Sequence, residues 1–381
     1  MKKKLKIAFI INFSHERWLG GSNYYLNILK AIRLHTNHSI KIFTGINKTK
    51  LNPGFIDYEV IYLKSLNPKL KMNIFTNYIR IFTLMFFKRD FILEKILKKY
   101  NIDVLSHSFP LGLNSNIKSL YWIPDLQELF LKDNFSLKKR LKRWIDNYIA
   151  ISNSSGILFS SKTMRNIFNK LYQKSKKKSH VLKFINYLPE NKPKGNLTKN
   201  LKNFFLISNQ FWIHKNYEVV LNALIELKKK KLSPLIISTG TKHEYRSSTY
   251  YSSLLSKIKN NRLINFKILG KISRNEQLNL ILNAKYLINP SKFEGWNTAI
   301  EEAKSLKTPV IASNLNVHRE QLGKNADYFD PNKFKYLSNI IKDKMNIKEK
   351  KTKKNYKKLL KTNRKKFKLF AHQYNKILNN L

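Results

Sequence analysis

The chain of 381 residues contains no cysteine, and this absence excludes disulfide bonds, thiolate metal sites and cysteine nucleophiles. Acidic residues are also scarce, with 23 Asp and Glu against 74 Lys and Arg, so the formal net charge is +51. Long apolar runs are missing as well, because none approaches the ~20 residues that span a bilayer. The sequence therefore predicts neither a disulfide-stabilised protein nor an integral membrane protein.

The excess of positive charge would attract polyanions, either nucleic acid or an anionic membrane. The lysines are scattered, however, with denser runs only at 138–143, 174–178, 228–231 and 349–366, and nothing resembles a zinc finger or an RNP motif. The chain is also rich in Asn and Ile, as products of AT-rich coding sequences tend to be. We attribute most of the charge to this bias and keep a polyanion-binding or RNA-binding protein as an alternative.

Composition favours a globular protein, since 42% of the residues are hydrophobic and 13% are aromatic. The length leaves room for two domains with substantial cores. The N-terminus, MKKKLKIAFIINF, begins like a signal peptide, but no small-residue cleavage site follows it, so we expect a first β-strand there. The expected location is the cytoplasm, and peripheral attachment to the inner face of the cell membrane stays open.

Strand and helix patterns alternate in both halves of the chain, which is typical of parallel sheets in doubly wound α/β domains. Strand-like runs occupy 5–11, 39–44, 58–63, 103–107, 119–123 and 156–160, and then 203–208, 234–239, 264–269, 284–289 and 309–313. Helical patterns in the second half occupy 217–230, 250–259, 275–283 and 298–306. We expect a Rossmann-like N-terminal domain at 1–190, a linker at 191–202, a Rossmann-like C-terminal domain at 203–360, and a helix at 361–381 that returns to the first domain.

Residues suited to ligand binding fall at the carboxyl ends of the expected strands. They are the pair Gly20-Gly21, the segment 210–215, Gly240, Gly270 and Glu294. Ligands of doubly wound sheets bind at this edge, and glycine lets the backbone approach a phosphate or a sugar closely. Their convergence indicates a ligand site more strongly than any one of them does.

The most informative segment is 289–309, which reads NPSKFEGWNTAIEEAKSLKTP. It places Glu294 and Glu302 on either side of a loop-to-helix junction, with seven residues between them. Thr298 and Glu301 fit a capping box that opens a helix through about Leu306. The start of this helix would offer backbone N–H groups and a positive dipole end to a phosphate, and carboxylates beside it can hold sugar hydroxyls.

This segment, continued by PVIAS and NVHREQLGKNADYFDP, resembles the donor-site signature of retaining GT-B glycosyltransferases, in particular glycosyltransferase family 4 (glycosyl transferases group 1). The similarity extends upstream through LGKISRNEQL at 269–278 and ISNQFWIHKNYEVVLNAL at 207–224. In the N-terminal half it depends on the Gly20-Gly21 pair and on WIPDLQ at 122–127. It implies a GT-B fold, with two domains facing a central cleft, and transfer of a sugar from a nucleotide diphosphate sugar to an acceptor hydroxyl. The implied pathway is cell-surface polysaccharide or glycolipid synthesis.

The resemblance also implies roles for individual residues. Glu294 and Asp125 would be catalytic, Glu302 would bind the ribose and Lys215 the diphosphate. The remaining donor-binding residues would be Gly20, Gly21, Gln210, Gly240, Gly295, Trp296, Asn297 and Thr298. The two glutamates would hold hydroxyls rather than act as a glycosidase pair.

The resemblance implies no cofactor besides the donor substrate. Because no Asp-x-Asp element stands out, a metal is not expected either. The expected partners are the nucleotide-sugar donor and a saccharide or lipid-linked saccharide acceptor, without specific nucleic acid. A GT-B sugar epimerase or phosphorylase would share the fold, but the EGW and EE context and the lack of a cofactor-binding lysine site favour transfer.

The sequence departs from the family pattern at three positions. Gln210 stands where an Arg usually helps bind the diphosphate, and Pro124 stands where many relatives carry a His near the transferred sugar. His107 is a weak substitute, because such a residue is more often structural, and Asp125 and Glu128 are the polar groups left there. Lys307 replaces the glycine that commonly ends the helix, which would cost roughly 1 kcal/mol if its φ is positive.

The segment 72–99, MNIFTNYIRIFTLMFFKRDFILEKILKK, alternates apolar and basic residues at helical spacing. Two interpretations compete: a core helix of the N-terminal domain, or an amphipathic helix on anionic lipid. The nearly continuous apolar run at 81–87 favours the core helix, and one helix that serves both roles would suit a lipid-linked acceptor.

Overall fold

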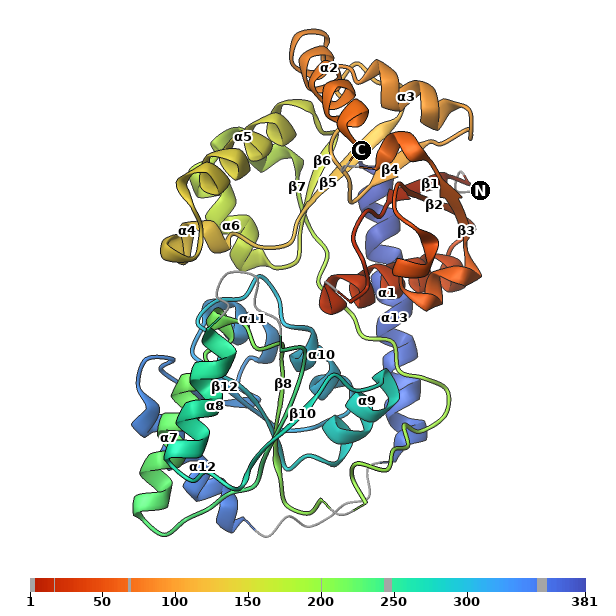
Figure 1. Ribbon diagram of the computed structural model, residues 1–381. Helices are drawn as coiled ribbons and strands as arrows, with labels where there is room; N and C mark the ends of the chain where they lie inside the picture. Colours follow the sequence, from red (N-terminus) through yellow and green to blue (C-terminus); the bar gives the residue numbers. More distant parts are fainter. Residues whose placement is uncertain (1–3, 17, 68–69, 200, 243–248, 348–354) are drawn as a thin grey trace. The chain divides into compact units, whose positions relative to one another are not determined.

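The computed structural model describes residues 4–16, 18–67, 70–199, 201–242, 249–347 and 355–381 (Figure 1). The chain forms two compact units. The first comprises Met1–Leu126, Phe135–Ile185 and Lys365–Leu381, and the second comprises Gln127–Asn134 and Asn186–Arg364. Each unit is built on its own parallel sheet with helices on both faces, so the expected pair of Rossmann-like domains is confirmed.

The sheet of the first unit has the strand order β3-β2-β1-β4-β5-β6-β7, and all neighbours are parallel. The strands are β1 (Lys6–Ile10), β2 (Ser39–Thr44), β3 (Glu59–Tyr62), β4 (Val104–Ser106), β5 (Lys118–Ile123), β6 (Gly156–Phe159) and β7 (Ser179–Val181). The chain builds outward from β1 in one direction and then continues at β4 on the other side. This reversal makes the carboxyl ends of β1 and β4 the switch point, where doubly wound sheets bind ligands.

The helices of the first unit are α1 (Leu19–His35), α2 (Lys71–Phe87), α3 (Phe91–Lys98), α5 (Leu137–Asn153) and α6 (Lys162–Leu171). Short 3₁₀ turns are η1 (Lys48–Lys50), η2 (Pro53–Asp57), η3 (Lys64–Leu66) and η5 (Gln173–Lys178). The final helix, α13 (Tyr356–Asn379), contributes its last residues to this unit. There the hydroxyl of Tyr374 donates to Ser106 Oγ at 2.6 Å, and the side chains of Asn375 and His38 are hydrogen-bonded at 2.8 Å.

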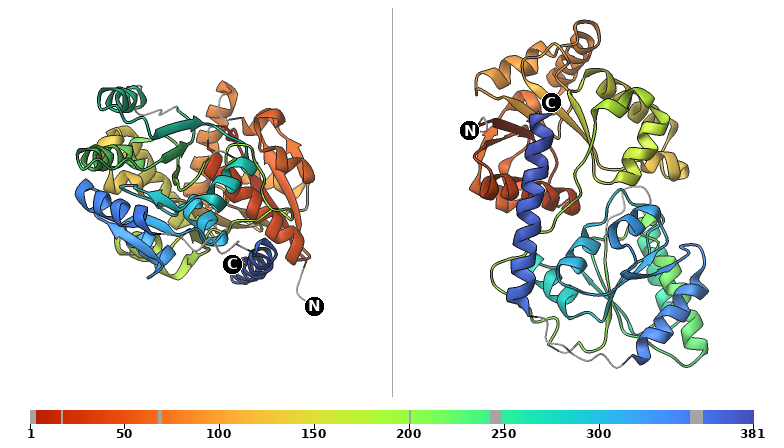
Figure 2. Two further views of the ribbon diagram at one scale, coloured as in Figure 1. Left: turned by 90° about the horizontal axis from the view of Figure 1, so that it is seen from below. Right: turned by 180° about the vertical axis from the view of Figure 1, so that it is seen from behind.

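The sheet of the second unit has the order β10-β9-β8-β11-β12-β13, again all parallel (Figure 2). Its strands are β8 (Phe205–Ser208), β9 (Ile236–Thr239), β10 (Phe266–Gly270), β11 (Tyr286–Asn289), β12 (Val310–Ser313) and β13 (Ala326–Phe329). Its helices are α4 (Gln127–Phe130), α7 (Tyr217–Lys229), α8 (Tyr250–Asn260), α9 (Arg274–Asn283), α10 (Thr298–Ser305), α11 (Asn316–Leu322) and α12 (Phe334–Asn346), with the 3₁₀ turns η4 (Lys132–Asn134) and η6 (Ile213–Lys215).

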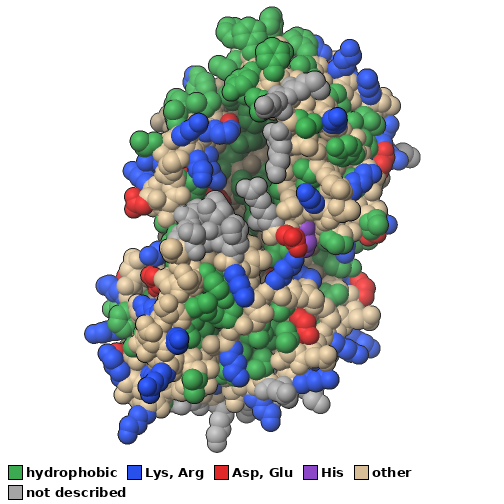
Figure 3. Space-filling view, viewed as in Figure 1, with side chains coloured by type: hydrophobic (Ala, Val, Ile, Leu, Met, Phe, Trp, Pro, Cys, Tyr) green, Lys and Arg blue, Asp and Glu red, His purple; other side chains and the backbone are tan. Residues whose placement is uncertain are grey.

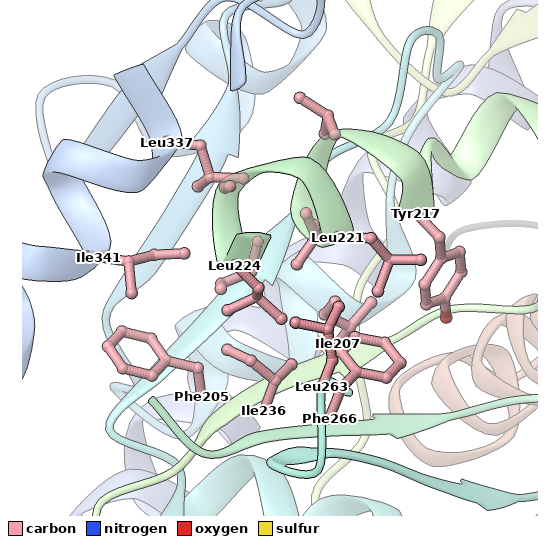
Figure 4. Close-up of a cluster of buried hydrophobic side chains, with 14 of the residues drawn as sticks. Phe205, Ile207, Tyr217, Leu221, Leu224, Ile236, Leu263, Phe266, Leu337 and Ile341 are labelled. Atoms are coloured by element: carbon pink, nitrogen blue, oxygen red, sulfur yellow. The ribbon is translucent and has the colours of Figure 1, made fainter. Parts of the chain in front are cut away.

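The core of the second unit explains its apolar strand sequences. Alternate residues of β8 face opposite sides of the sheet, so Phe205 and Ile207 pack with α7 and α12 (Figure 4). Leu206 packs on the other face, with α9 and α10. Both faces are therefore buried, as in parallel sheets generally, and a strand buried on both faces reads as an unbroken apolar run. The same holds for β11, β12 and β9, whose residues are almost all buried.

The expected strands are confirmed with boundaries shifted by two residues at most, and the four helices expected in the second half are found. Sequence reasoning missed β7 and β13. Each of these short strands lies at an edge of its sheet and pairs on one side only, so a continuous apolar run is not required of it.

The core interpretation of 72–99 is confirmed for α3, where Leu93 and Leu97 pack into the core of the first unit, and it is wrong for α2. The segment forms two helices, α2 and α3, which separate at Lys88 in a left-handed conformation (φ 54°) and at Asp90, whose side chain caps α3 by accepting from Leu93 N at 2.9 Å. Among the described side chains of α2, only Asn73 and Leu84 are buried. Within the described residues, no helix combines the length and the apolar character required to cross a membrane.

Candidate donor site in the second unit

The site is assembled where β11 leads into α10. Asn297 caps this helix, because its side chain accepts from Ile300 N at 3.0 Å. The expected capping box of Thr298 and Glu301 is therefore wrong: Thr298 is the first helical residue, and Glu301 binds Lys304 and Gln321 instead. The cap lies one residue upstream of the expected position, and Asn is a better N-cap than Thr.

Glu294 lies in the loop before this helix and is buried. One of its carboxylate oxygens, Oε1, accepts three hydrogen bonds, from Lys215 Nζ at 2.6 Å, Ser291 Oγ at 2.7 Å and Asn297 Nδ2 at 2.9 Å. No hydrogen bond to the other oxygen, Oε2, is found among the described residues. The carboxylate is thus held rigidly by one oxygen while the second can accept from a ligand.

Burial is the largest single effect and raises the pKa of Glu294, but the nearby charges of Lys215, His214 and His318 and the hydrogen bond from Lys215 together lower the pKa to about 2. The residue is therefore a carboxylate at neutral pH and cannot supply a proton. This charge state suits a group that holds hydroxyls and does not suit a general acid.

Lys215 ends η6, directly after the segment that follows β8. The next residue, Asn216, takes a left-handed conformation (φ 55°), and its side chain donates to the carbonyls of Pro290 and Pro331 at 3.0 and 2.8 Å. The backbone of His214 also accepts from Lys292 N at 2.8 Å. These bonds fix the loop after β8 against the loop after β11, which is what brings Lys215 to Glu294.

Glu302 lies on the second turn of α10 and is also buried, but its surroundings differ. It forms an ion pair with Arg274 and accepts from Gln277 Nε2 at 3.3 Å. Gln277 in turn donates to Ser208 Oγ at 2.9 Å, at the carboxyl end of β8. Burial raises the pKa of Glu302, and Arg274 offsets only part of that effect. The two glutamates of the motif are thus each buried with one cation.

Sequence reasoning missed four residues that surround the glutamates of the motif: Arg274, Gln277, Gln321 and His318. Arg274 and Gln277 stand in the quoted stretch LGKISRNEQL, at the start of the helix after β10, so their position at a strand end was the available signal. His318 donates from Nδ1 to the carbonyl of Ser313 at 2.8 Å, and its buried Nε2 has no hydrogen-bond partner among the described residues. No spacing rule indicated that residue.

The other predicted donor-site residues of this unit occupy neighbouring strand ends. Gly240 follows β9 with φ 137°, and a Cβ there would lie 2.1 Å from the carbonyl oxygen of Asn209, so only glycine fits. Gln210 follows β8, and its amide donates to Thr241 Oγ1 at 3.0 Å. Trp296 is buried beside the α10 cap, and Gly295 precedes it in the same loop.

The remaining predicted site residues, Gly20, Gly21 and Asp125, belong to the first unit. Gly20 and Gly21 lie in the first turn of α1 rather than in a loop, and a Cβ on Gly21 would collide with the Trp18 ring at 2.3 Å. Asp125 follows β5 and pairs with Arg143 at 3.2 Å. Glu128 opens α4, which belongs to the second unit, and is buried.

His107 is a structural residue. Its ring nitrogens contact the side chains of Tyr24 at 3.1 Å and Ser106 at 2.8 Å, inside a buried aromatic cluster that includes Phe9 and Trp122. Burial lowers its pKa to about 3, so the ring is neutral. The structural interpretation is therefore favoured over a catalytic one.

A pocket of about 220 Å³, with both polar and apolar walls, opens in the first unit at the switch point of its sheet. Its walls come from the ends of β1 and β4, from the segment around η3, and from the inner face of α2. The lining residues are Ile10, Asn12, Ser65, Leu66, Asn77, Arg80, Leu93, Ser108 and Phe109. Among the described residues of the whole chain, no group of three or more His, Asp or Glu is arranged to hold a metal ion.

The chain resembles known glycosyltransferases in sequence and in fold. Residues 189–366 match the family model described as glycosyl transferases group 1. A curated relative, the O-antigen chain mannosyltransferase RfbU of Salmonella typhimurium, is 27% identical over 254 residues, which are 66% of this chain and 67% of that protein.

Two solved structures share the fold. The Anabaena protein Alr3699/HepE, solved with UDP and glucose, superposes with a TM-score of 0.71 at 17% identity, covering 99% of this chain and 100% of that one. A glycosyltransferase from Rickettsia africae ESF-5 gives a TM-score of 0.67 at 18% identity, covering 99% and 98%. Residues 189–366 are therefore similar to the glycosyl transferases group 1 family, and the chain has the GT-B fold of glycosyltransferases.

Proposed function

We propose that the protein is a retaining, metal-independent glycosyltransferase that moves a sugar from a nucleotide diphosphate sugar to the hydroxyl of a saccharide or lipid-linked saccharide. The acceptor would belong to cell-surface polysaccharide or glycolipid synthesis, and the protein would work at the inner face of the cell membrane. The mannosyltransferase relative and the UDP-containing structure of similar fold support this class of donor and product.

The observation that carries the proposal is the buried contact between Lys215 and Glu294 beside the start of α10. A lysine ammonium has three N–H donors, so the bond to Glu294 leaves donors for diphosphate oxygens. Glu294 has a free oxygen for a sugar hydroxyl. Cation and carboxylate at one helix N-terminus thus match the two ends of the bond that breaks, the phosphate oxygen and the anomeric sugar.

Each residue then has a role in the reaction. The C1–O bond of the donor breaks, its electron pair leaves with the diphosphate, and Lys215 and the amides at the start of α10 stabilise the charge that develops there. Glu294, with backbone groups at Gly295, Trp296 and Thr298, orients the sugar, and Glu302 holds the ribose through the arrangement that Arg274 fixes. Gly20, Gly21, Gln210 and Gly240 would line the diphosphate side. Asp125 would act on the acceptor side, the acceptor oxygen would form the new C1–O bond on the face that the diphosphate left, and the proton of the acceptor hydroxyl would pass to the departing diphosphate.

Donor binding and stereochemistry test this proposal directly. A thermal-shift panel of nucleotide sugars should identify a donor that protects the wild-type protein, and polyanions such as RNA should not protect it in the same way. NMR of the product made from that donor should show the anomeric configuration of the donor retained. An inverted product would leave transfer standing and refute retention.

Metal independence has its own test. Because Lys215 and the start of α10 would stabilise the leaving group, turnover should be unchanged after treatment with EDTA. Activity that disappears with EDTA and returns with Mg²⁺ or Mn²⁺ would assign the diphosphate to a metal ion and contradict the role of Lys215.

A further inference from the structure

The outer face of α2 is apolar, aromatic and exposed to solvent. Side chains at helical spacing form one stripe along it, and Phe75, Tyr78 and Phe86 keep 70%, 68% and 69% of their surface exposed. Phe82 and Met85 complete the stripe at 54% and 49%. Figure 3 shows hydrophobic side chains gathered over this helix. An apolar surface of this extent marks a site of interaction on most proteins.

A second stripe lies on α5, which contacts α2 and lies beside it in the views of Figures 1 and 2. Leu137, Leu141, Trp144 and Tyr148 recur at helical spacing with between 54% and 78% of each side chain exposed. Exposed lysines stand between them in sequence, at 138, 139 and 142. Trp and Tyr between cations are the residues that proteins place at the boundary of lipid and water.

The charges around the two stripes favour an anionic surface as the partner. α2 has no acidic residue, and α5 has only Asp146, which Lys142 already pairs at 2.7 Å. A second copy of this chain carries the same formal net charge of +51, so self-association through this face is opposed by repulsion. On α3, Glu94 already engages Arg89 and Lys98, so α5 supplies the more available cations.

The inner face of α2 is polar, so the helix has its polarity reversed relative to an ordinary surface helix. Asn73, Asn77, Arg80 and Leu84 repeat at helical spacing on the side that meets the unit. Asn77 and Arg80 line the 220 Å³ pocket, where Arg80 is also held by Asp90 at 2.8 Å. One helix therefore has an apolar face toward solvent and a polar face toward a pocket of sugar size.

We propose that the stripes of α2 and α5 dock on an anionic lipid bilayer, with α2 lying in the interface and its inner face presenting the pocket to an acceptor carried by that bilayer. The assignment of the pocket to an acceptor rests on the proposed glycosyl transfer, whereas the docking surface stands on exposure and charge alone. Insertion of the aromatic stripe supplies a salt-independent contribution to binding, and the α5 lysines supply a salt-dependent one.

Co-sedimentation with vesicles tests the docking surface. Binding to vesicles that contain phosphatidylglycerol is compared with binding to vesicles of pure phosphatidylcholine. Phe75→Ser, Phe82→Ser and Phe86→Ser together should weaken binding on the order of a hundredfold, and what remains should be abolished by salt. Lys138→Gln, Lys139→Gln and Lys142→Gln together should weaken binding roughly tenfold or more at low salt and less at high salt.

Two control variants distinguish loss of the docking surface from the general effect of removing apolar side chains or charges. Ile56→Ser, Ile264→Ser and Leu369→Ser remove three exposed apolar side chains outside the stripes, and Lys357→Gln, Lys361→Gln and Lys365→Gln remove three charges elsewhere. Neither control should change vesicle binding. Binding that is equally weakened by a control set, or unchanged in the stripe variant, would overturn the proposal. So would a dimer that the stripe variant dissociates.

Measurements on the wild type and the stripe variant also distinguish a failure of membrane docking from a failure of the proposed glycosyl transfer. Nucleotide-sugar protection, measured without vesicles, should be unchanged in the stripe variant because α2 is not part of the donor site. With a membrane-borne acceptor the stripe variant should lose turnover, and with a short soluble saccharide it should keep it. If no nucleotide sugar protects even the wild type, glycosyl transfer fails while the vesicle assay still decides the docking surface.

Discussion

Helices α2 and α7 have a similar share of apolar residues, yet α7 buries these side chains and α2 exposes most of them. α7 buries seven side chains against the sheet of the second unit and carries its charges, such as Glu226 and Lys229, on the outside. α2 buries two described side chains and turns its polar positions, Asn77 and Arg80 among them, inward. Apolar content therefore does not indicate burial by itself. The side on which the polar residues recur decides which face meets the protein core.

Buried ion pairs are common to the two units, because the first unit buries Asp90 beside Arg80 and Glu94 beside Arg89. The second unit buries two carboxylates, Glu294 and Glu302, and gives each a cation. Removing one partner of such a pair leaves an unpaired buried charge and costs more than the pair contributes. Paired buried carboxylates therefore do not distinguish the units, whereas an apolar helix face exposed to solvent, as on α2, does set the first unit apart from the packing of α7.

The largest expected effect is on the free energy of unfolding, and it compares a buried side chain of α7 with an exposed one of α2. Leu221 lies fully buried on α7, so Leu221→Ala should lower the free energy of unfolding by about 3–4 kcal/mol, from lost transfer energy and the cavity left behind. Phe75→Ala on α2 removes a larger side chain, but the change should be within about 0.5 kcal/mol because 70% of it is already in water. Urea denaturation of both variants measures the difference. A destabilisation of the same size by Phe75→Ala would show that α2 packs against the protein.

The next effect concerns catalysis. Glu294→Ala should lower kcat on the order of a hundredfold or more, because the carboxylate is expected to hold the sugar in the transition state. Glu302→Ala should instead raise the donor KM about tenfold, since it removes one charge-assisted hydrogen bond to the ribose. Glu226→Ala, on the outer face of α7, is the matched control and should leave both constants unchanged. Near-normal turnover in folded Glu294→Ala would remove that residue from the site.

How the two glutamates respond to pH should differ in sign. The folded pKa of Glu294 is lowered to about 2, so its contribution to stability is present above its unfolded pKa and is lost as the pH falls. Relative to Glu294→Gln, the wild type should lose about 2 kcal/mol between about pH 5.5 and pH 3. The folded pKa of Glu302 is raised, so relative to Glu302→Gln the wild type should gain stability over the same interval. Denaturant titrations at several pH values measure both, and parallel curves would contradict the opposite environments.

The sequence predicts the second unit better than the first for a physical reason. Its strands are buried on both faces and its site lies at their ends, so apolar runs mark the strands and the residues just after them mark the site. The partner of Glu302 was not predictable, because Arg274 comes from a different strand end and only the sheet order brings the two together. The burial of α2 is mispredicted because its run of apolar residues suggests a core helix. The helical spacing of Asn73, Asn77 and Arg80 is the feature of the sequence that indicates the inward face.

The smallest expected effect concerns backbone strain, which both units contain. Lys307, after α10, and Lys88, after α2, hold left-handed conformations with φ of 51° and 54°. Glycine adopts this region without the Cβ penalty, so Lys307→Gly and Lys88→Gly should each raise the free energy of unfolding by up to about 1 kcal/mol.

Asn216 is the informative counterpart, because it shares the conformation (φ 55°) but donates from its side chain to the carbonyls of Pro290 and Pro331. Asn216→Gly relieves the same strain and removes both bonds, so it should destabilise the protein by about 1–2 kcal/mol. It should also lower donor affinity, since those bonds hold Lys215 near Glu294, whereas Lys307→Gly and Lys88→Gly should leave affinity unchanged. Thermal denaturation with and without the donor measures both quantities. A stabilised Asn216→Gly with unchanged donor affinity would show that the loop after β8 keeps its place without these hydrogen bonds.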